Sequence, residues 1–126
     1  MKKLLASMLV LSAVMLAGCR TAPIYNVNDA AIPSGKQHSM QDIQSAIVRA
    51  GDKLGWVMRV VKPGEIEGRL ALRTHVAVVS IPYTQKSYSI VYKSSENLNQ
   101  QGSEIHSNYN GWVQNLERRI NAELGI

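Results

Sequence analysis

The polar residues best suited to contact a ligand or a partner protein surround the start of the last amphipathic segment of the chain. They are Arg73, His75, Asn97, His106 and Asn110. On a helix, a step of about 100° per residue places His106 and Asn110 at one border of the apolar stripe. Because a loop, a strand end and a helix start commonly form a pocket, we predict that these side chains form a binding site. Alternatively, they bind loop backbone groups and hold the loop on the sheet, the more common role of such residues.

Nucleophilic catalysis is a weaker hypothesis. Ser94 or Ser95 would be the nucleophile, His106 or His75 the base, and Glu96 or Glu104 the group that orients the base. The sequence contains no Gly-x-Ser-x-Gly motif, which would place a serine on a sharp turn. Since serine and histidine are common, we expect a protein that is not an enzyme, with a serine hydrolase as the minor alternative.

Metal chemistry is also weakly indicated. His38, His75 and His106 are far apart in the sequence and form no pair at ligand spacing. The chain has one cysteine, which excludes an internal disulfide and a cysteine-rich zinc site. We therefore expect no metal and no cofactor.

One predicted strand has a charged face. Glu65, Glu67, Arg69 and Arg73 alternate with apolar residues, so they share one side of the strand. This face is suited to lipid headgroups or glycan phosphates. More often, mixed charges of this kind are simply the solvated face of a two-layer fold.

Hydrophobic periodicity predicts the elements that position these residues. A helix follows the capping pair Ser39 and Asp42 and ends at Gly55. A second helix begins between Ser103 and Ser107, after a polar loop over 94–102. Alternating or continuous apolar runs predict strands at 56–62, 65–73, 76–83 and 88–93.

This order favours an α+β fold: a two-layer sandwich in which a four-stranded antiparallel meander carries the N- and C-terminal helices on one face. The single domain is expected at 39–126. Residues 20–38 lack periodicity and contain Pro23 and Pro33, so the sequence predicts a flexible tether there, with a short extended segment around Ile24 to Val27 as an alternative.

The N-terminus has the pattern of a secretory signal. Lys2 and Lys3 precede an apolar run from Leu4 to Leu16. This run is shorter than the about 20 residues that a membrane-spanning helix needs. It suits the hydrophobic region of a signal peptide.

The residues Leu16-Ala17-Gly18-Cys19 that end this run resemble the lipobox of bacterial lipoproteins. The resemblance implies that residues 1–18 are a signal peptide and that the thiol of Cys19 takes a diacylglycerol. Position 20 is Arg rather than the Asp of many inner-membrane lipoproteins. The resemblance therefore implies an outer-membrane lipoprotein whose domain faces the periplasm.

The domain itself resembles a group of small proteobacterial lipoproteins for which no activity is established. The matching stretches are Pro63-Gly64, Leu72-Arg73-Thr74-His75, Tyr88-Ser89-Ile90-Val91-Tyr92, Ser95-Glu96-Asn97-Leu98, Ile105-His106, Tyr109-Asn110 and Trp112. The resemblance implies one small anchored domain and brings no activity.

Composition is consistent with a folded domain that is not a nucleic-acid binder. The chain has 126 residues, of which 45% are hydrophobic and 18% charged. Its formal charge is +5, but Lys2 and Lys3 belong to the signal, and a periplasmic location argues against nucleic acid. We predict a binding or interaction module, accessory to an envelope complex. The alternative is a binder of small anionic, glycan or lipid ligands with a cleft beside the C-terminal helix.

Overall fold

The computed structural model describes residues 20–35 and 38–126, which form an α+β domain with a five-stranded antiparallel sheet and two helices. The predicted signal peptide and Cys19 lie outside the described residues. The elements are β1 (Thr21–Pro23), β2 (Val27–Ala31), α2 (Met40–Lys53), β3 (Val57–Lys62), β4 (Glu65–Leu72), β5 (His75–Pro82), β6 (Ser87–Glu96), β7 (Glu104–His106) and α3 (Ser107–Leu124). The main sheet has the order β2-β6-β5-β4-β3, and β1 pairs with β7 in a separate two-stranded sheet.

Helix α2 begins where the sequence predicts. The Ser39 hydroxyl accepts from the Asp42 backbone N–H at 3.0 Å, and the Asp42 carboxylate accepts from the Ser39 N–H at 3.1 Å. This capping box satisfies two donors that would otherwise have no partner in the helix. The chain leaves the helix through Gly55, whose φ of 87° few other residues adopt.

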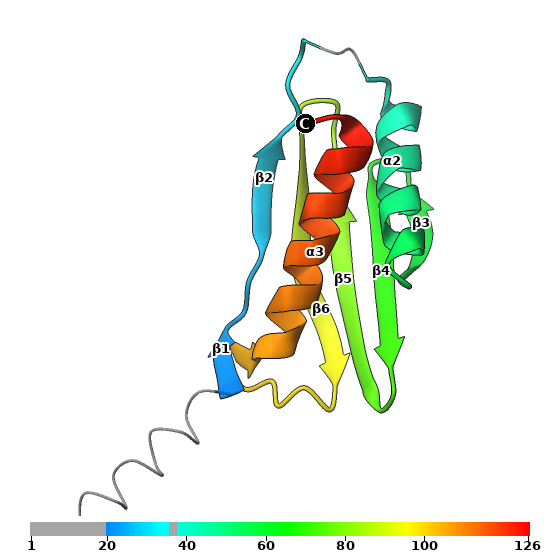
Figure 1. Cartoon of the computed structure of the whole chain (residues 1–126). Coiled ribbons are helices and arrows are strands. Elements are labelled where there is room, and N and C mark those ends of the chain that lie inside the picture. The colour runs from blue at the N-terminus through cyan, green and yellow to red at the C-terminus, as the bar shows by residue number, and fades with distance from the viewer. Residues whose placement is uncertain (1–19, 36–37) are drawn as a thin grey trace, which may run out of the picture.

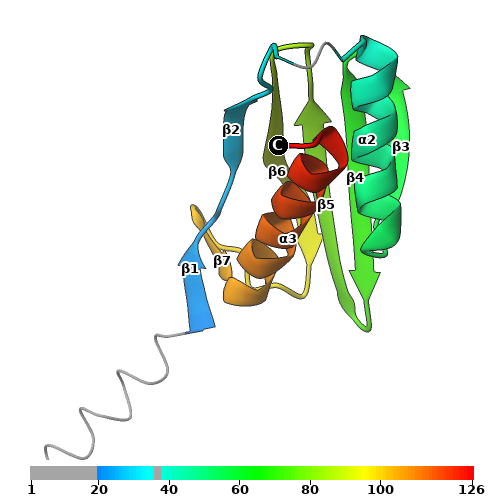
Figure 2. The same ribbon diagram turned by 45° about the horizontal axis from the view of Figure 1, so that its top comes forward.

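The core lies between the sheet and the helices, both of which lie on the same side of the sheet (Figures 1 and 2). Alternate residues of β4 and β5 point into it, and each helix adds one apolar stripe. The fully buried side chains include Ile43, Ile47, Ile66, Val79, Ile81, Tyr88, Ile90, Tyr109, Val113, Leu116 and Ile120. Neither helix is long and apolar enough to cross a membrane within the described part of the chain.

The predicted tether is wrong for residues 20–35, which are part of the folded domain. Strand β2 pairs with β6, with Val27 opposite Ile90, and forms the fifth strand of the sheet. Strand β1 pairs with β7. Burial of Val27 and Ile32 stabilises this segment despite its weak local strand propensity. The domain therefore starts before Ser39. The main sheet has five strands, one more than the sequence predicts.

The predicted polar loop over 94–102 is also shorter than expected. Strand β6 continues to Glu96, so Ser94 and Ser95 lie within a strand opposite Val78 and Ala77. Pairing with β5 supplies hydrogen bonds that outweigh the low strand propensity of serine. A further short strand, β7, precedes α3 because its backbone finds a partner in β1.

The domain has two distinct ends (Figure 1). At the lower end in that view lie β1, the β4–β5 turn, the β6–β7 connection and the start of α3. We call it the β1 end. At the opposite end lie the β5–β6 turn, the start of α2 and the C-terminus. Strand β6, with ten residues, spans about 30 Å between them.

Candidate functional site

Three of the five predicted site residues meet at the β1 end, where the β4–β5 turn approaches the end of β6. The Nδ1 atom of His75 lies 2.7 Å from the carbonyl oxygen of Asn97. Since a carbonyl oxygen only accepts, Nδ1 is the donor, and Nε2 of the neutral ring remains an acceptor. The Asn97 side-chain amide donates to the carbonyl of Thr74 at 2.8 Å. These bonds close the turn onto β6.

The backbone of this cluster is unusual. Arg73 and Asn97 both have a φ of 57°, in the left-handed region. Asparagine tolerates this region better than most residues, whereas arginine gains nothing local from it. The guanidinium of Arg73 is exposed at the tip of the turn.

The two other predicted residues lie at the start of α3. The Nδ1 atom of His106 accepts from the backbone N–H of Asn108 at 3.1 Å, so His106 is the N-cap of the helix. Its ring is therefore the tautomer opposite to that of His75, with the proton on Nε2. The His106 backbone N–H donates to the carbonyl of Leu98 at 2.8 Å, which ties the helix start to the β6–β7 connection.

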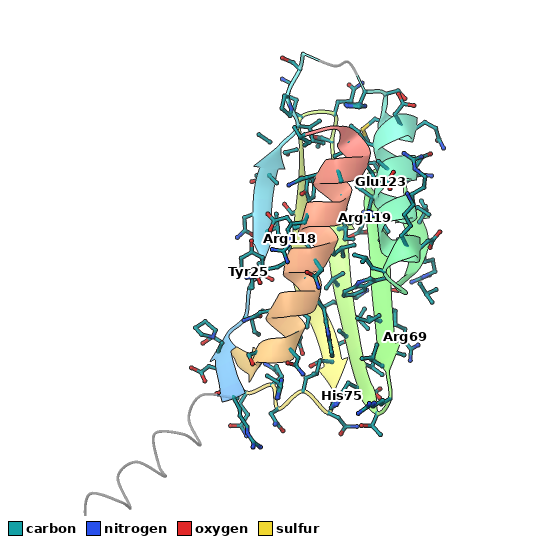
Figure 3. All side chains as sticks on the ribbon, viewed as in Figure 1. Tyr25, Arg69, His75, Arg118, Arg119 and Glu123 are labelled. Carbon is teal, nitrogen blue, oxygen red and sulfur yellow. The ribbon has the colours of Figure 1, made fainter. Side chains whose placement is uncertain are left out.

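Asn110 binds the N-terminal segment. Its Oδ1 accepts from the Tyr25 backbone N–H, and its Nδ2 donates to the Pro23 carbonyl, each at 2.9 Å. Two turns along α3, Glu117 accepts from the hydroxyl of Tyr25 at 2.7 Å. This bond, together with burial, raises the pKa of Tyr25. Figure 3 shows Tyr25 lying beside α3.

The five residues thus form two adjoining groups joined through Leu98, not one pocket. Their hydrogen bonds go to backbone groups of the turn, the helix start and the N-terminal segment. The bonds of His106 and Asn110 are of the kind that the alternative interpretation requires, in which these residues hold loops in place. Arg73 and His75 remain accessible for contact with a partner.

Ser95, one of the two candidate nucleophiles, makes a contact within its own strand. Its Oγ lies 2.8 Å from the hydroxyl of Tyr92. Ser94 is exposed on β6. Within residues 20–35 and 38–126, no three His, Cys, Asp or Glu side chains are grouped so that they would hold a metal ion.

The sequence predicts a cleft beside the C-terminal helix but not the residues of the cavities that the structure has at the opposite end of the domain. A cavity of about 330 Å³ lies between α2 and the end of α3. Its polar lining consists of His38, Asp42, Ser45, Arg49 and Glu123. Cavities of about 570 and 250 Å³ adjoin it, and His38 lines all three. None of the five predicted residues lines any of them. Among the residues noted in the sequence, His38 and the capping pair Ser39 and Asp42 line these cavities.

Arg49 and Glu123, two of the charged residues along this cavity, are paired with each other. Glu123 accepts from Lys53 Nζ at 2.6 Å and from Arg49 Nε at 3.1 Å, and these bonds lower the pKa of Glu123. Hydrogen bonds from Ser39 lower the pKa of Asp42. Figure 3 shows Glu123 between the two helices, where its ion pairs join α3 to α2.

The face of the sheet turned away from the helices carries three of the four predicted charged residues, Glu65, Glu67 and Arg69, whereas Arg73 lies in the β4–β5 turn. Glu67 accepts from Lys93 Nζ at 2.7 Å and from Arg59 Nη2 at 2.8 Å, and these bonds lower the pKa of Glu67. Arg69, opposite Val57 and Val78 in the two neighbouring strands, adds a third cation. Val57 is 67% exposed. We call this surface the open face.

Comparison with known proteins adds no assignment. No protein-family model matches the chain, and no curated protein matches it.

Proposed function

We propose that the chain is a lipid-anchored lipoprotein of the outer membrane, whose periplasmic domain is a binding module accessory to an envelope complex. The observation that carries the proposal is that β1 starts at Thr21, two residues after the lipobox cysteine Cys19. Consecutive Cα atoms are about 3.8 Å apart, so the anchor would lie within about 7.6 Å of the folded domain. A domain held so closely would meet its partners at the membrane surface.

The first two strands would transmit the position of the anchor to the rest of the domain. Asn110 binds the backbone on both sides of Ile24, and the Ile24 N–H donates to the carbonyl of Ser103 at 2.8 Å. The bond between Tyr25 and Glu117 fixes the same segment on α3. Because the bonded residues 23–25 lie only four to six residues after Cys19, they support a short, ordered link to the lipid.

The open face is the surface that we propose for the protein partner. Val57, Val78 and Val91 form its apolar part. Both helices of the described residues lie on the other side of the sheet, so neither covers these valines (Figure 2). The three cations Arg59, Arg69 and Lys93 outnumber the two carboxylates of this face, Glu65 and Glu67. A partner with apolar side chains surrounded by acidic ones would complement this surface.

The anchor is tested by the intact mass of the protein purified from membranes. We expect the mass of a chain that starts at Cys19 and carries acyl groups. Cys19→Ala should lack this mass and leave the membrane fraction, whereas Arg20→Ala should keep the acyl groups. A Cys19 chain of unmodified mass would refute the proposal.

The partner is tested by a photo-crosslinking amino acid placed at Val78 in the acylated protein. We expect one dominant crosslinked envelope protein, and loss of the adduct when Arg69→Glu is added. The matched control carries the same group at Gln114, an exposed position of α3 on the other side of the domain. Equal crosslinking at both positions, or none at Val78, would contradict a partner on the open face.

A small-ligand binder is the second candidate, and the cavity of about 330 Å³ beside the C-terminal helix favours it. Because Arg49 is paired with Glu123, the lining offers mixed donors and acceptors, which suits a glycan better than an anion. A ligand at 100 times its Kd would stabilise the domain by about 2.7 kcal/mol. No change in Tm with muropeptides would count against this candidate.

A further inference from the structure

A continuous series of hydrogen bonds joins β1 to the tip of the β4–β5 turn. Thr21 pairs with His106 in the small sheet, and the His106 N–H donates to the Leu98 carbonyl at 2.8 Å. The preceding residue, Asn97, donates to the Thr74 carbonyl at 2.8 Å. These segments, far apart in sequence, therefore form one end of the domain, as Figures 1 and 2 show.

The tip of this end combines an apolar and a cationic side chain. The side chain of Leu72 is 48% exposed, although most of the other leucines that the structure describes are buried. Arg73, the next residue, is exposed, and so is Arg20 beside the cysteine. Leucine favours the boundary between headgroups and acyl chains, and arginine pairs with phosphate.

The other charged residues of the β1 end weaken the electrostatic attraction of the tip to an anionic bilayer. Glu96 and Glu104 also lie here, and Glu104 accepts from the Thr21 hydroxyl at 3.2 Å. With both signs present, electrostatic attraction to an anionic bilayer is weak. Acyl chains contribute about 0.8 kcal/mol per buried CH2, so the affinity would come from Cys19 and the orientation from the tip.

We infer that the β1 end is a phospholipid-contacting surface, with Leu72 and Arg73 at the level of the headgroups. This inference rests on the proposed function, because it needs the anchor at Cys19. In this orientation the strands run from the bilayer surface into the periplasm. The cavities around His38 would then lie about 30 Å from the membrane, accessible from the periplasm.

The test measures the height of two labelled sites above the membrane. The acylated protein has no free thiol, because its only cysteine carries the lipid. A fluorophore is attached to Thr74→Cys at the β1 end or to Gln85→Cys in the β5–β6 turn at the opposite end. The protein is placed in vesicles of phosphatidylethanolamine and phosphatidylglycerol that contain a headgroup-labelled acceptor lipid, and energy transfer is recorded.

We expect severalfold more transfer from residue 74 than from residue 85. Equal transfer, or more from residue 85, in a chain whose mass shows the acyl groups would overturn the orientation alone. A chain without acyl groups would instead refute the proposed function, and the orientation with it.

A double variant tests whether the tip contacts the membrane. Leu72→Ser with Arg73→Gly removes the apolar and cationic groups, and glycine suits the positive φ at position 73. We expect the ratio of transfer between the two sites to fall towards one. An unchanged ratio would overturn the assignment of Leu72 and Arg73 to the membrane contact.

Discussion

Asn110 holds the backbone of Tyr25 across 85 residues of sequence, with its Oδ1 2.9 Å from the Tyr25 amide nitrogen. Its Nδ2 binds the Pro23 carbonyl at the same distance, so one side-chain amide satisfies two backbone groups of the N-terminal segment. An asparagine that the sequence suggests for ligand contact thus binds the chain itself.

We expect Asn110→Ala to lower the free energy of unfolding by about 1 to 2 kcal/mol, because the partly buried Tyr25 amide and the exposed Pro23 carbonyl lose their partner. Urea unfolding measures this change. Gln114→Ala, at an exposed position of the same helix, should change the free energy by less than about 0.5 kcal/mol. Equal effects of the two substitutions would show that Asn110 does not fasten the segment.

The pKa of Tyr25 predicts a loss of stability in alkali. Its hydrogen bond to Glu117 raises the pKa of the phenol above the ordinary 10.0. The unfolded chain therefore loses this proton at lower pH than the folded chain, so this contribution to stability is complete below pH 10 and declines above it.

Tyr25→Phe tests this. We expect the variant to be less stable than the parent at pH 7 and to lose less stability between neutral pH and alkali. Tyr83→Phe, which removes a hydrogen bond to the neutral Gln44, is the control and should keep the steeper fall. The Tm of each protein is measured over this pH range. An equal fall in Tm for Tyr25→Phe and the parent would contradict the prediction.

Glu123 predicts the opposite behaviour in acid. Hydrogen bonds from Lys53 and Arg49 lower its pKa below the ordinary 4.5. Its contribution to stability is complete above pH 4.5 and is lost as the pH falls through the lowered value. We expect Glu123→Gln to show a shallower acid transition in circular dichroism. The control is Glu96→Gln, at an exposed position of β6 far from these ion pairs, and it should keep the acid transition of the parent protein.

The positive φ of Arg73 predicts a stabilising substitution. Arg73→Gly removes the steric cost of a side chain at φ 57°, and we expect a gain of about 0.5 to 1 kcal/mol. Asn97→Gly is the comparison: it has the same φ, but it also loses the bond to Thr74, so it should stabilise less or destabilise. A lower Tm for Arg73→Gly would mean that the arginine side chain makes a stabilising contact.

The parts of the fold that local sequence specifies were predictable. The capping box of Ser39 and Asp42 places the start of α2 without help from other segments. The alternation in β4 likewise comes from its own residues, with Ile66 and Leu70 buried and Arg69 exposed.

Strands β1 and β2 could not be found in this way. Asn28 and Asp29 favour turns, and Asp29 has a φ of 50°. What makes this segment extended is its pairing with β6 and the amide of Asn110, both far along the chain. The lining of the cavity at His38 was missed for the same reason, since it comes from α2 and α3 and depends on how they pack.

The distant pairing of the N-terminal strands sets the order in which this chain can fold. The Asp29 amide binds Ser89, 60 residues later, and the Tyr25 amide binds Asn110, 85 residues later. As the polypeptide emerges from its N-terminus, the first segment has no partner until nearly the whole domain has followed. The hairpins from β3 to β6, whose loops are short, can form before that. Residues 20–35 are therefore made first among the described residues, but they cannot complete their contacts until β6 and the start of α3 have followed.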